Sequence, residues 1–217
     1  MVSLKQTLKD GYSLLRFLEY QIIDQISLTG SVIDLGAKSE NINYFNHLKL
    51  ENVEKVDYCD LKPLTENMPR VNLEKPFDSI RGGSYDHVLN FNVLEHIYNY
   101  KNVIDESFRI LKAGGVSHCM VPFMWNYHGD PDDFNRFTHT ALYRKYSDAG
   151  FDGIEIWPIG GGFWMLIASL LSRKTSFWWM KYIIIKIFTN FDKFEQQIVG
   201  KKANYALAFY VKAKKCL

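Results

Sequence analysis

Strand-like and helical patterns alternate along this chain, and no other feature of the sequence restricts its fold as strongly. Short apolar runs predict strands at residues 31–36, 53–59, 70–73, 85–91, 116–123, 154–157 and 204–213. Apolar residues spaced three or four apart predict helices at about residues 4–26, 40–48, 93–111 and 138–149. Thr29-Gly30 is expected to end the first of these helices, Gly114 and Gly115 to cap the third, and Thr138 to cap the start of the fourth. This order predicts an α/β fold with a Rossmann-like, mostly parallel sheet covered by helices on both faces. Ligands bind such sheets beyond the carboxyl ends of the strands.

The composition limits the classes of protein that this chain can belong to. With 217 residues and 47% hydrophobic residues, it is expected to form one domain over residues 1–217. That domain is predicted to include an N-terminal helix in 1–29 and a hydrophobic helical insertion in 158–203. A net charge of +2 argues against an electrostatic nucleic-acid binder, and 15% aromatic residues argue against a disordered chain.

The cysteines and histidines favour a cytoplasmic protein without a metal site. Cys59, Cys119 and Cys216 are odd in number and show no C-x-x-C spacing, which fits a reducing compartment. The histidines are scattered over separate elements without a metal-ligand spacing, so we expect no metal. No secretory signal opens the chain, and its apolar stretches are too short for a bilayer crossing.

A glycine follows the first predicted strand, and acidic residues follow the second. Gly36 lets backbone approach a ligand closely after Asp34. Asp60, with Asp57 as second candidate, stands where nucleotide-binding folds place a carboxylate that accepts ribose hydroxyl protons. Taken alone, these residues favour an ordinary turn at Gly36 and a solvated loop at Asp60.

Five segments in one order extend this pattern. They are Asp34-Leu35-Gly36, Asp60-Leu61-Lys62-Pro63, Asn92-Val93-Leu94-Glu95-His96, Arg109-Ile110-Leu111-Lys112-Ala113-Gly114-Gly115 and Asp148-Ala149-Gly150-Phe151. Together they resemble class I S-adenosylmethionine-dependent methyltransferases of the type 11 branch, over roughly residues 30–157. The resemblance implies a seven-stranded sheet with an antiparallel last strand and S-adenosylmethionine across the ends of its first four strands.

The resemblance also implies which residues hold the methyl donor. These are Asp34, Gly36 and Ala37 near its methionine part, Asp60 at the ribose, Asn72 with Leu73 at the adenine, and Asn90 and Asn92 at the sulfonium. The family usually has two further glycines where this chain has Lys38 and Glu40, side chains that restrict positive φ angles. An alternative function is therefore a methyltransferase-like binding or scaffold protein with impaired donor binding.

The acceptor is expected beside the loop after the fifth predicted strand. Methyl transfer to oxygen needs alignment and a base, and His128 is the first candidate base, with His96 second. Tyr127, Asp133 and Arg136 are the candidate acceptor-binding residues. The loop pattern H-x-x-P-x-D-x-x-R-x-T resembles type 11 relatives associated with surface-glycan biosynthesis, which implies O-methylation of a sugar or glycan precursor. The alternative is that Asp133 and Arg136 form an i,i+3 ion pair while His128 caps a turn.

Aromatic and basic residues are concentrated in residues 163–188. This composition is typical of helices at a membrane interface, so peripheral contact with the inner face of a membrane is one interpretation. The other is that the helices pack onto the sheet or onto a second copy of the chain in a homodimer.

Overall fold

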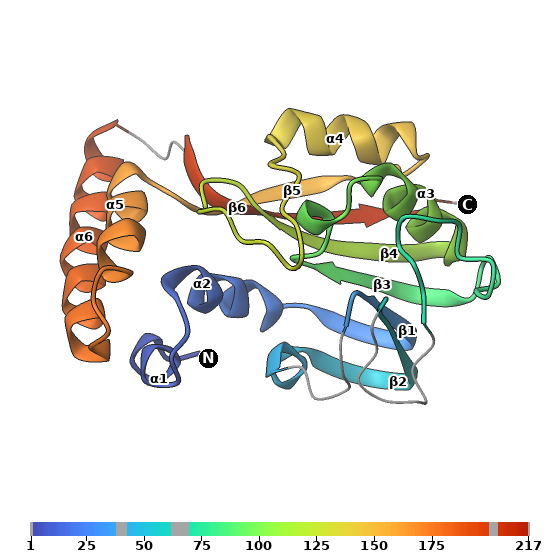
Figure 1. Cartoon of the computed structure of the whole chain (residues 1–217), viewed down its shortest axis with the longest axis horizontal. Helices are drawn as coiled ribbons and strands as arrows, with labels where there is room; N and C mark the ends of the chain where they lie inside the picture. The colour runs from blue at the N-terminus through green and yellow to red at the C-terminus, as the bar shows by residue number, and fades with distance from the viewer. Residues whose placement is uncertain (1, 38–42, 62–69, 200–203, 217) are drawn as a thin grey trace. The chain divides into compact units, whose positions relative to one another are not determined.

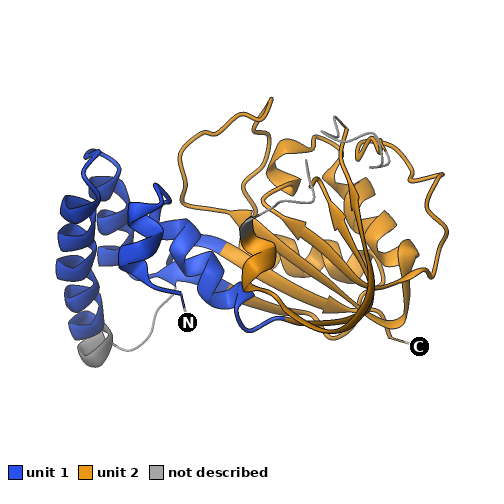
Figure 2. Ribbon diagram, turned by 90° about the horizontal axis from the view of Figure 1, so that it is seen from below, with its two compact units in different colours: residues 1–26, 158–208 blue, residues 27–157, 209–217 orange. Residues whose placement is uncertain are grey.

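The computed structural model describes residues 2–37, 43–61, 70–199 and 204–216. They form two compact units, which Figure 2 shows in different colours. Unit 1 comprises Met1–Ile26 and Pro158–Ala208, and unit 2 comprises Ser27–Trp157 and Phe209–Leu217. No helix in the described ranges is both long and apolar enough to cross a membrane.

The described strands form one sheet in the order β2-β1-β3-β4-β6-β5 (Figure 1). They are β1 (Ser27–Leu35), β2 (Lys49–Cys59), β3 (Tyr85–Phe91), β4 (Leu111–Pro122), β5 (Glu155–Gly161) and β6 (Tyr205–Lys214). The first four strands pair in parallel, and the final strands bring an antiparallel arrangement. This confirms the predicted α/β methyltransferase-like fold with its helical insertion and antiparallel last strand.

The sheet has six strands in the described residues, where the sequence predicted seven. The predicted strand at 70–73 is reduced to an isolated bridge between Arg70 and Asp60. Asn72 closes a turn there, because its side chain accepts a hydrogen bond from the Glu74 backbone N–H at 3.0 Å. A side chain that satisfies the local backbone in this way competes with strand pairing.

The helices and 3-10 turns lie between the strands. They are α1 (Leu4–Lys9), α2 (Leu14–Ile23), η1 (Asn43–His47), η2 (Leu94–His96), α3 (Tyr100–Ile110), α4 (His139–Asp148), α5 (Phe163–Ser172) and α6 (Trp178–Val199). Within unit 2, α3 and α4 lie on the same side of the sheet (Figure 1). The predicted cap of α4 is confirmed, since the Thr138 hydroxyl accepts a hydrogen bond from the Ala141 N–H at 3.2 Å.

Two predicted helices differ in the structure. The single N-terminal helix is two helices, because the Ser13 hydroxyl accepts a hydrogen bond from the Arg16 N–H and starts α2 anew. Residues 27–30, predicted to end that helix, already belong to β1. The helix predicted over 93–111 is likewise interrupted, with the 3-10 turn η2 preceding α3.

The glycines after α3 also differ from their prediction. Gly114 and Gly115 were expected to cap the helix, but β4 begins directly at Leu111 and includes both. The Gly114 N–H donates to the Lys215 carbonyl at 2.7 Å, and the Lys215 N–H donates to the Gly115 carbonyl at 2.9 Å. Pairing with the chain's last residues, which are distant in sequence, therefore decides the conformation of this segment.

Unit 1 has a hydrophobic cluster of its own. Leu8, Leu14, Ala168 and Ile185 are buried in it, and they come from α1, α2, α5 and α6. Asp192 of α6 is 4% exposed, and its carboxylate lies against Gly162, the N-cap residue of α5. A carboxylate at a helix N-terminus is favourable, because the helix dipole is positive there.

Replacing Gly162 with alanine is expected to destabilise unit 1. An added Cβ would lie 1.7 Å from Asp192 Oδ1 and 2.1 Å from Oδ2, so the buried carboxylate must move. Overpacking of this kind costs about 1–3 kcal/mol, which a thermal denaturation curve measures. Gly153→Ala is the control, because its added Cβ meets Lys214 at an ordinary 3.5 Å. Equal melting temperatures for the two variants would contradict the prediction.

Candidate functional site

The end of β1 carries a buried carboxylate beside a glycine turn. Asp34 is 1% exposed, and burial raises the pKa of its carboxyl group to about 7 although the Tyr44 hydroxyl donates a hydrogen bond to it. Gly36 follows with φ +86°, and a Cβ placed there would lie 2.6 Å from Val93 Cγ2. Only glycine fits this turn, because both the backbone angle and the neighbouring valine exclude a side chain.

Tyr44 links the ends of two strands of the sheet. It lies in η1, its hydroxyl contacts Asp34 at the end of β1, and its ring meets that of Phe91 edge to face at 5.2 Å. Phe91 is the last residue of β3. The chain's own side chains thus lie at the strand ends where the methyl donor is expected. Lys38 and Glu40, the departures from the family pattern, lie outside the described residues.

The segment after β2 is held by polar contacts with the turn before α3. The Asn102 amide nitrogen donates to the Leu73 carbonyl at 2.9 Å and to the Lys75 carbonyl at 2.7 Å. The Glu74 carboxylate accepts hydrogen bonds from the Tyr98 and Asn99 N–H groups, each at 2.8 Å. These contacts hold residues 73–75, which adjoin the position predicted for the adenine.

Asp57 and Asp60, the two candidates for the carboxylate that binds the ribose, differ in their surroundings. Asp57 accepts hydrogen bonds from Lys55 Nζ and from the Tyr85 hydroxyl, both at 2.7 Å. Burial acts to raise the pKa of Asp57, but these two partners hold it below its ordinary value. Asp60 pairs through its backbone, with the Val71 N–H donating to its carbonyl at 3.0 Å. Asp57 is therefore engaged in a local ion pair, which leaves Asp60 the better-placed candidate.

The end of β3 carries a buried amide with spare hydrogen-bonding capacity. Asn90 is 2% exposed, and its Oδ1 is 3.9 Å from the Cys119 thiol. Its Nδ2 has no hydrogen-bond partner among the described residues. A buried donor of this kind calls for an explanation, and a ligand or a water molecule is the usual one. Asn92 follows with φ +57° as the chain turns towards η2.

His96 in η2 has a defined tautomer. Its Nδ1 is 2.6 Å from the backbone carbonyl oxygen of Asp132, and a carbonyl oxygen only accepts, so Nδ1 carries the proton. In the neutral ring Nε2 then holds the lone pair. The carboxylate of Glu95, which is 3% exposed, lies 3.7 Å from that Nε2.

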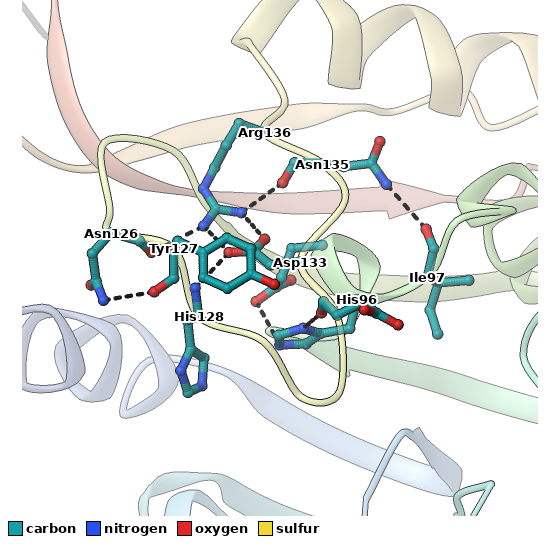
Figure 3. Close-up of polar contacts among 10 residues, drawn as sticks. His96, Ile97, Asn126, Tyr127, His128, Asp133, Asn135 and Arg136 are labelled. Carbon is teal, nitrogen blue, oxygen red and sulfur yellow. Dashed lines mark hydrogen bonds and ion pairs between the residues drawn. The ribbon is translucent and has the colours of Figure 1, made fainter.

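The loop between β4 and α4 brings His128 to His96, as Figure 3 shows. Their ring centroids are 5.7 Å apart, and the planes are inclined at 68°. The Phe134 N–H donates to the Glu95 carbonyl at 2.7 Å, and Asn135 Nδ2 donates to the Ile97 carbonyl at 3.0 Å. The loop is thereby anchored to η2, so the two imidazoles share one environment.

Asp133 and Arg136 form the ion pair that the alternative interpretation expected. The guanidinium makes two hydrogen bonds to the carboxylate and holds the pKa of Asp133 below its ordinary value. Arg136 also donates to the carbonyls of Asn126 at 3.1 Å and Asn135 at 2.8 Å, and the His128 N–H donates to Asp133 at 2.7 Å (Figure 3). These contacts stabilise the loop.

The structure brings some of the predicted site residues together and engages others elsewhere. His96 and His128 are neighbours, whereas Asp133 and Arg136 are occupied with each other and Tyr127 is 73% exposed. Ala37 is buried beside the first turn. Sequence reasoning missed Tyr44, which falls inside the helix predicted over 40–48. It also missed the Asp132 carbonyl, since a backbone group has no residue-type signal.

Comparisons with known proteins relate this chain to methyltransferases. Residues 40–119 match the Methyltransf_11 family, described as a methyltransferase domain. Among solved structures, a chain from the complex of the Haloferax volcanii Trm112 methyltransferase activator is 16% identical over 100% of both chains, with a TM-score of 0.56. A SAM-dependent methyltransferase from Archaeoglobus fulgidus is 14% identical over 98% of this chain and 95% of its own, with a TM-score of 0.55.

A third similar structure contains a ligand related to the methyl donor. Haemonchus contortus phosphoethanolamine N-methyltransferase 2, in complex with phosphomonomethylethanolamine and S-adenosylhomocysteine, is 15% identical with a TM-score of 0.55. The match covers 92% of this chain and 53% of that one. No curated protein sequence matches the chain. At these identities the likeness of the solved structures establishes the fold, and the family match makes residues 40–119 similar to a methyltransferase domain.

Proposed function

We propose that this chain, a class I S-adenosylmethionine-dependent methyltransferase by its fold and by the methyltransferase domain in residues 40–119, methylates a hydroxyl of a sugar or glycan precursor. The observation that carries the proposal is the hydrogen bond from His96 Nδ1 to the Asp132 carbonyl. It leaves the lone pair of the neutral ring on Nε2. A hydroxyl acceptor loses its proton during methyl transfer, so a positioned base is what this reaction needs.

The residues at the strand ends fit S-adenosylmethionine, which supplies a methyl group activated by a sulfonium. Asp34 offers a buried carboxylate, and Asn90 offers a buried amide N–H without a partner among the described residues. In our proposal Asp34, Gly36 and Ala37 hold the methionine part. Asp60 holds the ribose, Asn72 lies at the adenine edge, and Asn90 and Asn92 lie at the sulfonium side.

His96 and His128 are proposed to handle the proton at the acceptor. His96 accepts it at Nε2, which lies 3.7 Å from the Glu95 carboxylate. His128, whose ring lies beside that of His96, contacts the acceptor from the loop. Asp133 and Arg136 hold the loop in place, and Tyr127 offers its exposed ring to the acceptor.

Exposed aromatic rings near His96 support a sugar-like acceptor. Tyr98 is 75% and Phe134 48% exposed, and their ring centroids are 5.5 Å apart. Flat apolar rings beside hydrogen-bonding groups suit a molecule that has both C–H faces and hydroxyls. A cytoplasmic location is proposed with this acceptor, because the three cysteines are free thiols, as in a reducing compartment.

Replacing His96 with glutamine is expected to lower turnover about 100-fold while donor affinity stays within about twofold. Glutamine keeps a side-chain amide for hydrogen bonding but provides no base. The assay measures S-adenosylhomocysteine release with a panel of free and nucleotide-linked sugars, over pH 5.5 to 9. The pH profile of turnover should differ between the parent and His96→Gln.

His128→Gln is the matched control for His96→Gln. It should lower turnover less, because no described hydrogen bond orients the His128 ring. A substantial loss of donor affinity in either variant would assign that histidine to the donor instead. An unchanged pH profile in His96→Gln would contradict the proposed base.

The second candidate function is a methyltransferase-like binding protein with impaired donor binding. Tyr44 on Asp34 and Val93 against Gly36 favour it, because these side chains occupy the strand ends. Calorimetric titration with S-adenosylmethionine and S-adenosylhomocysteine separates the two functions. Micromolar binding that weakens in Asp60→Ala supports the enzyme, whereas no heat at millimolar ligand supports the binding protein.

A further inference from the structure

Helix α6 is apolar on two sides. Tyr182, Ile185 and Phe188 belong to the hydrophobic cluster of unit 1. Large apolar side chains that are at least 36% exposed form a second side, the α6 outer face: Trp179, Met180, Ile183, Ile187, Phe191 and Phe194. A surface helix normally exposes polar residues there, so this face indicates a binding partner.

The α6 outer face is a continuous stripe. At 3.6 residues per turn, its six side chains fall within an arc of about 120° over four turns. Phe177 at the start of α6, 62% exposed, extends the apolar surface, as do Leu170 and Leu171 at the end of α5. Helices α5 and α6 lie side by side (Figure 1).

Basic residues border the stripe. Lys186 and Lys193 are exposed and lie along one edge of it, by the same helical geometry. Arg173 and Lys174 are exposed in the connection between α5 and α6. Residues 163–195 contain five basic residues against two acidic ones, and one of the two, Asp192, is buried. Lys186 and Lys193 therefore give one edge of the stripe a positive charge.

The α1 helix adds positive charge to the same unit. Lys5 Nζ lies 5.9 Å and Lys9 Nζ 5.0 Å from the ring centroid of Trp178 at the start of α6. Trp178 packs against the hydrophobic cluster of unit 1 on the side of α6 away from the outer face, so these lysines add to the charge of the unit and do not border the stripe.

We propose that the α6 outer face docks on the surface of a bilayer that contains anionic phospholipids. Trp and Phe rings enter the boundary between headgroups and acyl chains, and the bordering Lys and Arg side chains contact lipid phosphates. The helix lies on the membrane and does not cross it, in agreement with the absence of a spanning helix in the described residues. This inference does not depend on the proposed methyl acceptor.

Charge favours a lipid surface over a second copy of the chain. In a two-fold dimer each copy presents the same face, so the lysine-bordered stripe would meet an identical stripe. Glu195 lies at the other edge of the stripe by the same helical geometry, so a second copy would offer one carboxylate against Lys186 and Lys193. Anionic headgroups supply negative charge along the whole face.

Vesicle flotation of the full chain tests the proposal. One set of vesicles is pure phosphatidylcholine, and the other contains one quarter phosphatidylglycerol. We expect the protein to float with the anionic vesicles, with at least about tenfold lower binding to neutral ones. High salt should reduce the binding to anionic vesicles, because it screens the lysine contacts.

Two double variants separate the apolar from the charged contribution. Ile187→Ser/Phe194→Ser should abolish flotation, and Lys186→Glu/Lys193→Glu should abolish the preference for anionic vesicles. Leu50→Ser/Lys49→Glu is the matched control, since it alters an exposed leucine and lysine on β2 and should float like the parent. Circular dichroism and melting curves confirm that each variant is folded.

Several outcomes would overturn the inference. One is a parent protein that remains at the bottom of the gradient with both kinds of vesicle. Another is a folded Ile187→Ser/Phe194→Ser variant that floats as well as the parent. A third is a dimer in light scattering that this variant dissociates, without flotation of the parent, which would assign the face to a second copy.

Discussion

Gly36→Ala is expected to destabilise the protein by about 2–5 kcal/mol, combining two independent costs. An alanine at φ +86° costs about 1–2 kcal/mol, because its Cβ crowds the following carbonyl. Its Cβ would also lie 2.6 Å from Val93 Cγ2 and 2.9 Å from Cγ1, and such overpacking costs about 1–3 kcal/mol. Equilibrium unfolding in urea measures the sum.

Gly114→Ala isolates the backbone part of this cost. Gly114 has a similar φ of +81°, but a Cβ added there meets nothing within 4 Å. The excess loss in Gly36→Ala is therefore the Val93 contact. Combining Gly36→Ala with Val93→Ala should cost less than the sum of the two single changes. If Gly36→Ala and Gly114→Ala lose the same stability, the close contact with Val93 is wrong.

Asp34→Asn is expected to remove a large pH dependence of stability. Burial raises the pKa of Asp34 in the folded protein from the ordinary 3.8 to about 7, so the folded state binds this proton more tightly than the unfolded state. The stability from this group is fully present below about pH 4 and is lost as the pH rises through about 7. The loss is on the order of 4 kcal/mol, which unfolding curves from about pH 4 to pH 8 measure.

Asp57→Asn provides a control of opposite sign. The partners Lys55 and Tyr85 lower the pKa of Asp57, so its contribution is present above its ordinary pKa and lost as the pH falls. Asp57→Asn should therefore weaken the protein at neutral pH without flattening the slope between about pH 5 and 8. A parent-like slope in Asp34→Asn would show that Asp34 titrates in its ordinary range.

The sequence predicted best those strands and helices whose apolar pattern lies within one short segment. The strand predicted at 85–91 is observed with the same bounds, and the helix predicted at 138–149 is α4 with its expected Thr138 cap. Boundaries were wrong where distant pairing outweighs local signals. Gly114 and Gly115 look like a helix end, but pairing with Lys215 makes them part of β4.

The candidate site likewise combines features that local sequence patterns predicted with features that depend on distant segments. Residue types in the loop after β4 indicated an imidazole base and an ion pair, and the structure contains the Asp133–Arg136 pair beside His128. The sequence predicted His128 as the first candidate base and His96 as the second, and our proposal reverses this order. Only the fold brings the Asp132 carbonyl to His96 Nδ1, and that contact is the reason we propose His96 as the base.

By itself, the sequence determined the α/β class, the methyltransferase resemblance and the set of groups available for chemistry. These depend on short-range periodicity and on motifs whose residues are close in the chain. The tertiary structure decided that Tyr44 contacts Asp34, that Val93 packs on Gly36, and that α6 keeps a second apolar face exposed. Those facts depend on which distant segments meet and which surfaces stay uncovered, and residue spacing along the chain contains no record of either.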